Sequence, residues 1–144
     1  MSSSRWEYME GSDRLLGEVA TAFADRVGDL AGVAGGSIFL CSDQQRVELC
    51  WGRSLAVVGH SFSFEDDIDC AVTDAAMKRA DVIPDPELLA WNCSCCGVSL
   101  GEFARSVHIG RDAAFEIFRH IITHMGRPDV GVDGPVIWMP LELK

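Results

Sequence analysis

Three apolar runs separated by very short connections are the feature that most restricts the fold of this chain. The runs are SIFLCS (37–42), RVELCW (46–51) and LAVVGHSFSF (55–64), with only DQQ and GRS between them. Connections this short can join antiparallel strands, whereas parallel strands need a crossover of roughly a dozen residues or more. The second run also alternates apolar and polar side chains, which is typical of a strand with one buried face. The pattern predicts an antiparallel meander.

Two amphipathic helices are predicted around this strand-rich region. The first covers 13–31 with Ser12 as its N-cap, and the second covers 112–125 and ends at Gly126 and Pro128. Their apolar stripes are Leu16, Val19, Phe23, Val27 and Leu30 in the first helix, and Ala114, Phe118, Ile121 and Met125, widened by Ile117 and Ile122, in the second. Spacings of three and four residues place each stripe on one helical face.

The remaining segments complete an α+β fold. We expect an irregular insert over 65–97, containing a short helix near 73–79, and one or two strands within 96–110, where Val107 and Ile109 alternate around His108. The tail GPVIWMPLEL reads as a final strand. The predicted fold is a mainly antiparallel sheet of about five to six strands, packed with an N-terminal helix and a C-terminal amphipathic helix. A length of 144 residues is most economically one domain, 1–144, whose residues 1–11 we expect to be flexible.

Charge and cysteine content narrow the possible partners and compartment. The chain has 22 acidic and 12 basic residues, a formal charge of −10, which opposes direct nucleic-acid binding and favours a basic protein partner. Neither a secretory signal nor an apolar run of membrane-spanning length is visible, so we expect a cytoplasmic protein that does not contact a membrane. There cysteines stay reduced, and Cys41, Cys50 and Cys70, which lie among apolar neighbours, are interpreted as core residues.

The stretch WNCSCCG (91–97) raises the question of a metal or redox site. Cys93 and Cys96 form a C-x-x-C pair, and His120 and His124 lie one helical turn apart, so the four have ligand types that zinc uses. The two histidines also fit a solvated helix face, and the favoured expectation is a chain without a cofactor. A redox pair is less favoured, because the residues after Cys96 do not read as the start of a helix.

Catalytic patterns are weak. The sequence has no H-E-x-x-H metalloprotease motif, and AGVAGGS lacks the Gly-Lys-Ser/Thr end of a phosphate loop. His108, between strand-like residues, is more typical of a hydrogen-bonded structural histidine than of a catalytic base. We therefore do not expect an enzyme.

Clustered carboxylates are the strongest candidates for a functional surface. The first-choice partner contacts are Glu65, Asp66, Asp67 and Asp69, followed by Asp85 and Glu87. Runs of charge are often simply solvated loops. In the functional alternative, crowded carboxylates would meet the basic active-site cleft of another protein.

The order of elements resembles a family of bacterial immunity proteins paired with polymorphic toxins, namely the family numbered one. The resemblance rests on the meander of 37–62, on VHIGRDAAFEIFRHIITHM, and on GRPDVGVDGPVIW, which contains Gly126, Arg127, Pro128 and Trp138. It implies a non-catalytic inhibitor, a monomer or homodimer, that binds a cognate protein toxin and blocks its active site. A longer spacer before Trp138 and the insert distinguish this chain from the family pattern.

Two other functions remain open. A type III secretion chaperone is also small, acidic and α+β, and it would act as a dimer that holds an unfolded effector segment. A zinc-dependent enzyme or metal-stabilised domain would use Cys93, Cys96, His120 and His124.

Overall fold

The computed structural model describes residues 7–8, 36–41, 45–62, 67–92, 99–124, 126–131 and 134–141. The predicted N-terminal helix over 13–31 lies outside these described residues, as do Glu65, Asp66 and the cysteines at 93, 95 and 96.

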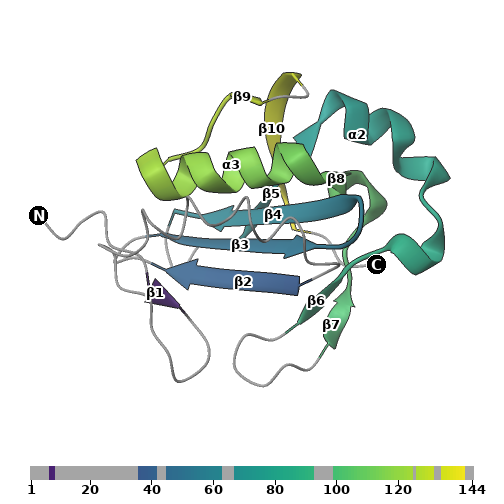
Figure 1. Cartoon of the computed structure of the whole chain (residues 1–144), viewed down its shortest axis with the longest axis horizontal. Coiled ribbons are helices and arrows are strands. Elements are labelled where there is room, and N and C mark those ends of the chain that lie inside the picture. The colour runs from purple at the N-terminus through teal and green to yellow at the C-terminus, as the bar shows by residue number, and fades with distance from the viewer. Residues whose placement is uncertain are drawn as a thin grey trace, which may run out of the picture.

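One antiparallel sheet forms the centre of the molecule (Figure 1). Its order is β1-β2-β3-β4-β5-β10-β9, and the short β8 pairs with the beginning of β4. The strands are β1 (Glu7–Tyr8), β2 (Gly36–Cys41), β3 (Arg46–Trp51), β4 (Leu55–Ser61), β5 (Asp69–Thr73), β8 (Ile109–Gly110), β9 (Val130–Gly131) and β10 (Gly134–Pro140). Consecutive strands β2, β3 and β4 pair as neighbours, which confirms the predicted meander.

The other elements pack around this sheet. The helices are α2 (Asp74–Arg79) and α3 (Arg111–His124); the short 3-10 turns are η1 (Ala80–Val82), η2 (Asp85–Glu87) and η3 (Arg105–Val107); and β6 (Ala90–Asn92) pairs with β7 (Ser99–Glu102) in a separate hairpin. The fold is therefore α+β with a mainly antiparallel sheet, as predicted from the sequence. No helix in the described part of the chain is long and apolar enough to cross a membrane.

Two sequence-based expectations differ from the structure. Part of the predicted irregular insert is regular, because β5 lies inside the sheet between β4 and β10. The residues around His108 are not one strand: η3 precedes His108, and only the two residues of β8 follow it as strand. In both places consecutive side chains are buried, so apolar and polar residues do not alternate along the chain. The alternating pattern that indicates a half-buried strand is therefore missing from the sequence.

The two faces of the sheet carry separate apolar clusters. Helix α3 lies along one face (Figure 1) and buries the predicted stripe, apart from Met125, which is outside the described residues. This first cluster contains Leu49, Trp51, Val58, Ala71, Ile117, Phe118 and Ile121. The second cluster contains Cys50, Val57, Cys70, Val72, Phe103 and Val107, with Leu89 packed against it. Cys50 and Cys70 are buried free thiols, which confirms their predicted place in the core.

Strand β4 organises the region that follows. It is buried along its whole length and pairs with β3 on one side, and with β8 and β5 on the other. Near its end, His60 lies opposite Val47 of β3 and Asp69 of β5. The preceding residue, Gly59, has no side chain, and a Cβ there would lie 2.9 Å from a methyl carbon of Ile68. Gly59 thus lets the segment before β5 pack directly on β4.

Candidate functional site

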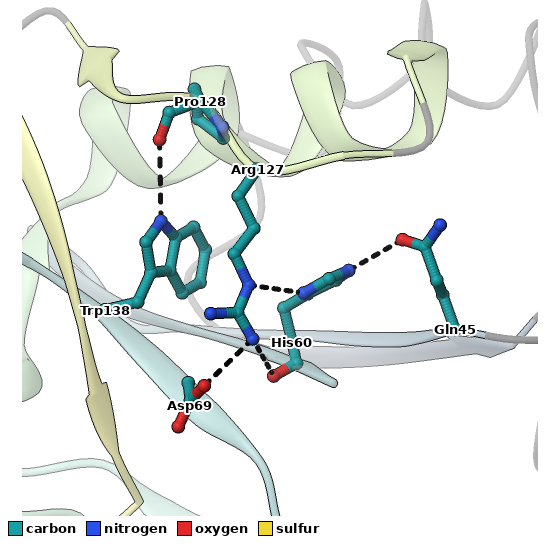
Figure 2. A network of polar contacts seen from close by, with 6 residues as sticks. All are labelled: Gln45, His60, Asp69, Arg127, Pro128 and Trp138. Carbon is teal, nitrogen blue, oxygen red and sulfur yellow. Dashed lines mark hydrogen bonds and ion pairs between the residues drawn. The ribbon is translucent and has the colours of Figure 1, made fainter. Parts of the chain in front are cut away.

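A polar cluster centred on Arg127 lies where β4, β5 and β10 meet the loop after α3 (Figure 2). The Nε–H of Arg127 donates to Nδ1 of His60 at 2.8 Å, and Nη2 donates to the His60 carbonyl oxygen at 3.2 Å. The same Nη2 lies 3.0 Å from a carboxylate oxygen of Asp69. Because Pro128 follows Arg127 and the helix ends just before them, this arginine leaves α3 and reaches back to the sheet.

Two aromatic rings enclose the guanidinium of Arg127. Its central carbon lies 4.4 Å from the ring centroid of Phe62 and 4.7 Å from that of Trp138. The indole N–H of Trp138 donates to the Pro128 carbonyl oxygen over a long 3.4 Å. A guanidinium between two aromatic faces gains cation–π attraction while it is partly withdrawn from water. Phe62 is the exposed wall of this arrangement, with 52% of its surface accessible.

His60 connects the cluster to the core. It is fully buried, and its Nε2 lies 2.7 Å from the side-chain oxygen of Gln45, also buried. Because Arg127 donates to Nδ1, the ring must carry its proton on Nε2 and donate it to Gln45. Burial first, and then the charge of Arg127, lower the pKa of His60 to about 4. The ring is therefore neutral at pH 7, and both of its nitrogens are occupied.

The first-choice acidic residues are divided between two roles. Asp67 is exposed, and Asp69 is half-buried and paired with Arg127. Glu65 and Asp66 lie outside the described residues, so their position as partner contacts stays a prediction. The structure thus places the end of the acidic run beside the Gly-Arg-Pro and tryptophan residues on which the family resemblance rests.

The second-choice residues Asp85 and Glu87 are not part of this cluster. Glu87 helps to line a pocket beside Leu55, at the beginning of β4, whereas His60 is near its end. A strand of this length spans roughly 20 Å. Asp85 forms an ion pair with Arg105. Asp69 and Glu87 therefore lie near different ends of strand β4.

Of the four proposed zinc ligands, the structure describes only His120 and His124. His120 and His124 have ring centroids 4.5 Å apart on α3, and burial, followed by the charge of His124, lowers the pKa of His120. In Figure 1 the hairpin β6–β7, which flanks the cysteine run, lies at the lower right near the end of β2, whereas α3 lies along the top of the sheet. No group of three or more His, Cys, Asp or Glu suited to a metal occurs among the described residues. Zinc binding through Cys93 and Cys96 stays untested.

The letters G-x-S-x-G, which we had taken to be absent from the sequence, do occur as GVSLG (97–101). A nucleophile elbow needs its serine on a sharp turn between a strand and a helix. Ser99 is instead the first residue of β7 and pairs with Asn92 in the hairpin. The residues after β7 lead into η3, a single 3-10 turn. The structural context of a hydrolase nucleophile is absent from this part of the described chain.

His108 is a structural histidine, as predicted. It is fully buried; its Nε2 accepts from the Leu89 N–H at 2.8 Å, and its Nδ1 lies 2.9 Å from the Ala104 carbonyl oxygen. Burial lowers the pKa of His108, opposed by its backbone hydrogen bonds. The thiol of Cys70 is equally unreactive, because burial above all raises its pKa to about 12.

Sequence reasoning did not single out Gln45, His60 or Phe62. A histidine within an apolar strand, LAVVGHS, was the available signal, because a buried polar side chain requires a partner. Its partner Arg127 is 67 positions away, and no local pattern links the two.

Comparison with family models, with curated proteins and with solved structures gave no match.

Proposed function

We propose that this protein is a non-catalytic inhibitor of the immunity type, which binds a basic protein toxin through the surface formed by Phe62, Asp67 and the Arg127 cluster. One observation carries the proposal: the exposed ring of Phe62 lies on the guanidinium of Arg127, which is paired with Asp69 at the end of the acidic run. Aromatic and arginine side chains dominate the energetics of protein interfaces. The toxin would be met in the cytoplasm.

The rigidity of this surface supports a binding role. Arg127 is fixed by His60, by Asp69 and by two aromatic rings, so Phe62 rests on a support that is already ordered. Ordering an interface side chain only on binding costs about 0.5–1.5 kcal/mol per residue. A surface that is held in place before the partner arrives avoids much of that cost.

The charge of the chain supports a basic partner. The formal charge is −10, and Asp67 stands exposed next to the cluster. Attraction between opposite charges accelerates association and disfavours acidic competitors. A toxin that acts on nucleic acid needs a basic cleft, and carboxylates in front of such a cleft would stand where phosphates lie.

The two fully buried histidines of the described chain favour binding over catalysis. His60 and His108 have both ring nitrogens occupied, and the pKa of each is lowered. A general base must be able to reach the proton of a substrate. These two rings, closed off from water, serve the fold instead.

The test is capture of the protein encoded by the neighbouring gene, followed by charge reversal. The full-length chain should bind the toxin domain of that product and restore growth of cells that express it. Asp67→Lys should weaken binding at least about tenfold at low salt and much less at high salt, because the lost attraction is screened.

Asp112→Lys is the matched control, since Asp112 is an exposed carboxylate on α3 and the charge change is the same. At about 0.15 M salt, where the Debye length is about 8 Å, it should leave binding within about twofold of the wild type. Asp112 follows β8, which pairs with the beginning of β4, whereas His60 is near the end of that strand. Failure to bind the neighbouring product would reject the inhibitor function. If Asp67→Lys and Asp112→Lys weakened toxin binding equally, the proposed binding surface would be rejected.

A further inference from the structure

Strand β10 has an outer edge that no described strand covers over most of its length. On one side, residues 136–140 pair with β5 from Thr73 back to Asp69. On the other side, β9 pairs only with Gly134 and Pro135. The Val136 N–H also bonds to the Asp129 carbonyl oxygen, so the part of β10 beyond Val136 is an edge of the sheet within the described chain.

The direction of the backbone groups along this edge follows from two hydrogen bonds. The Val136 N–H donates to the Asp129 carbonyl oxygen at 2.8 Å, away from β5, and the Leu141 N–H donates to the Ile68 carbonyl oxygen at 2.9 Å, on the β5 side. Backbone groups of successive strand residues point to alternate sides of an antiparallel strand. The N–H and C=O of Trp138 consequently point outward, where a further strand could bond to them.

The side chains of the same stretch are apolar and exposed. Ile137 is 50% accessible and Met139 41%, and both project from the sheet face opposite α3. Residues 134–141 carry no charge. Soluble proteins normally protect an open edge with lysine, proline or a cover. Here prolines occur at 135 and 140 only, so the middle of the edge keeps its hydrogen-bonding groups and apolar surface.

The distribution of charge indicates which kind of strand the edge accepts. Pro140 pairs with Asp69, so the exposed Asp67 lies near one end of the edge. At the other end, the exposed Asp129 is bonded through its carbonyl oxygen to Val136. A second copy of this chain would add another net charge of −10 to the same surface. A segment with basic residues would instead be attracted at both ends.

We propose that β10 binds an extended basic segment of the partner protein by strand addition, with Trp138 supplying the backbone hydrogen bonds and Ile137 and Met139 the apolar contacts. In this mode of recognition the main chain provides affinity and alternate side chains provide specificity. The identity of the partner as a toxin rests on the proposed function. The edge itself adjoins the Arg127 cluster through Trp138, so one partner would contact both.

The experiment uses a short synthetic peptide in which valine and threonine alternate between terminal lysines, with the full-length protein. The peptide should bind and should slow hydrogen exchange of the Trp138 amide. A peptide with glutamates in place of the lysines should bind at least about tenfold more weakly, because its charges face Asp67 and Asp129. Equal binding of the two peptides, or an unprotected Trp138 amide, would overturn the proposal.

Two exposed substitutions locate the site. Ile137→Lys should weaken the lysine peptide about tenfold, because it removes apolar contact and adds repulsion. Val82→Lys is the control, since Val82 is 75% accessible on η1, beyond the C-terminal end of α2, and it should leave the affinity unchanged. If Ile137→Lys and Val82→Lys weakened peptide binding equally, strand addition at β10 would be contradicted. Concentration-dependent dimerisation abolished by Ile137→Lys would show that a second copy occupies the edge instead.

Affinity measurements with the captured toxin distinguish strand addition at β10 from the inhibitor function. If the toxin binds and Ile137→Lys has no effect on its affinity, the inhibitor function stands and strand addition is rejected. If no toxin is captured but the lysine peptide protects Trp138, the inhibitor function is rejected and the edge stands as a peptide-binding site.

Discussion

His60 and His108 are both fully buried, yet their surroundings differ in kind. His108 is held by two backbone groups, the Leu89 N–H and the Ala104 carbonyl oxygen. His60 is held by two side chains, Gln45 and Arg127. A histidine bonded to backbone groups joins segments inside the fold, here the one that contains Leu89 to the one that contains Ala104. A histidine bonded to a partly exposed arginine ties the core to a surface that a partner can reach.

The two sites also differ in what a single substitution can change. At His108 the partners are backbone atoms, so only the histidine itself can be altered. At His60 the same arginine bonds to the ring, pairs with Asp69 and stacks on Phe62. The Arg127 cluster should therefore couple stability, acid sensitivity and partner binding, whereas His108 should affect stability and acid sensitivity alone.

The largest effect is expected from Arg127→Ala. It leaves His60 Nδ1 without its donor and Asp69 without its cation, and it opens a gap between Phe62 and Trp138. Loss of one partner of a largely buried pair costs about 3–5 kcal/mol in the free energy of unfolding. Urea denaturation of the purified variant measures this loss.

Arg127→Lys is the informative companion. It keeps the positive charge but cannot bond to His60 and Asp69 in the same forked geometry. About half of the loss should therefore remain. If Arg127→Lys were as stable as the wild type, the positive charge alone would account for the stabilisation by Arg127. The stacking on the aromatic rings and the two hydrogen bonds to His60 would then contribute little.

Acid should destabilise the protein through both histidines, most clearly through His60. Its pKa is 6.5 in the unfolded chain and about 4 in the folded one, so between these values the unfolded state binds more protons. The stabilising contribution is complete above pH 6.5 and is lost as the pH falls toward 4, by about 3 kcal/mol in total. Urea midpoints measured across this range test the sign and the size.

His60→Gln removes the titrating ring and should flatten this dependence, although the variant is less stable at pH 7. The residual slope reports on the remaining groups, among them His108 and His120, whose pKa values burial also lowers. If the pH dependence of the urea midpoint were the same in His60→Gln as in the wild type, the acid sensitivity would come from other groups. His60 would then not differ from His108 in this respect.

The elements that sequence reasoning predicted are those whose signal is local. Short turns fixed the pairing of β2, β3 and β4, and three- and four-residue spacing fixed the buried face of α3. Strand β5 was missed because DCAVT is buried on both faces and so does not alternate. Of the Arg127 cluster, only Asp69, Arg127 and Trp138 were indicated beforehand, since its other members meet only through long-range contacts.

His108→Phe should cost less than Arg127→Ala and should leave partner binding intact. The ring is similar in size, but the Leu89 N–H and the Ala104 carbonyl oxygen lose their partners in a buried place. Unsatisfied buried groups cost about 1–3 kcal/mol, so a loss of about 2 kcal/mol is expected in urea denaturation. Weakened capture of the toxin by a folded His108→Phe protein would break the contrast between the two histidines.

The smallest effect on stability, and the sharpest separation of stability from binding, is expected from Phe62→Ala. Phe62 is half-exposed, so its removal forfeits about 0.5–1 kcal/mol of contact with Arg127. Trp138 would still cover the guanidinium, and His60 and Asp69 would still hold it.

Toxin affinity should nevertheless fall by about 2 kcal/mol or more if Phe62 is an interface anchor. Calorimetric titration beside urea denaturation gives both quantities, and Phe62→Trp, which keeps an aromatic face, should recover most of the affinity. An alanine variant that binds as tightly as the wild type would leave Phe62 as no more than a cover for Arg127, and the cluster would then be as purely structural as the environment of His108.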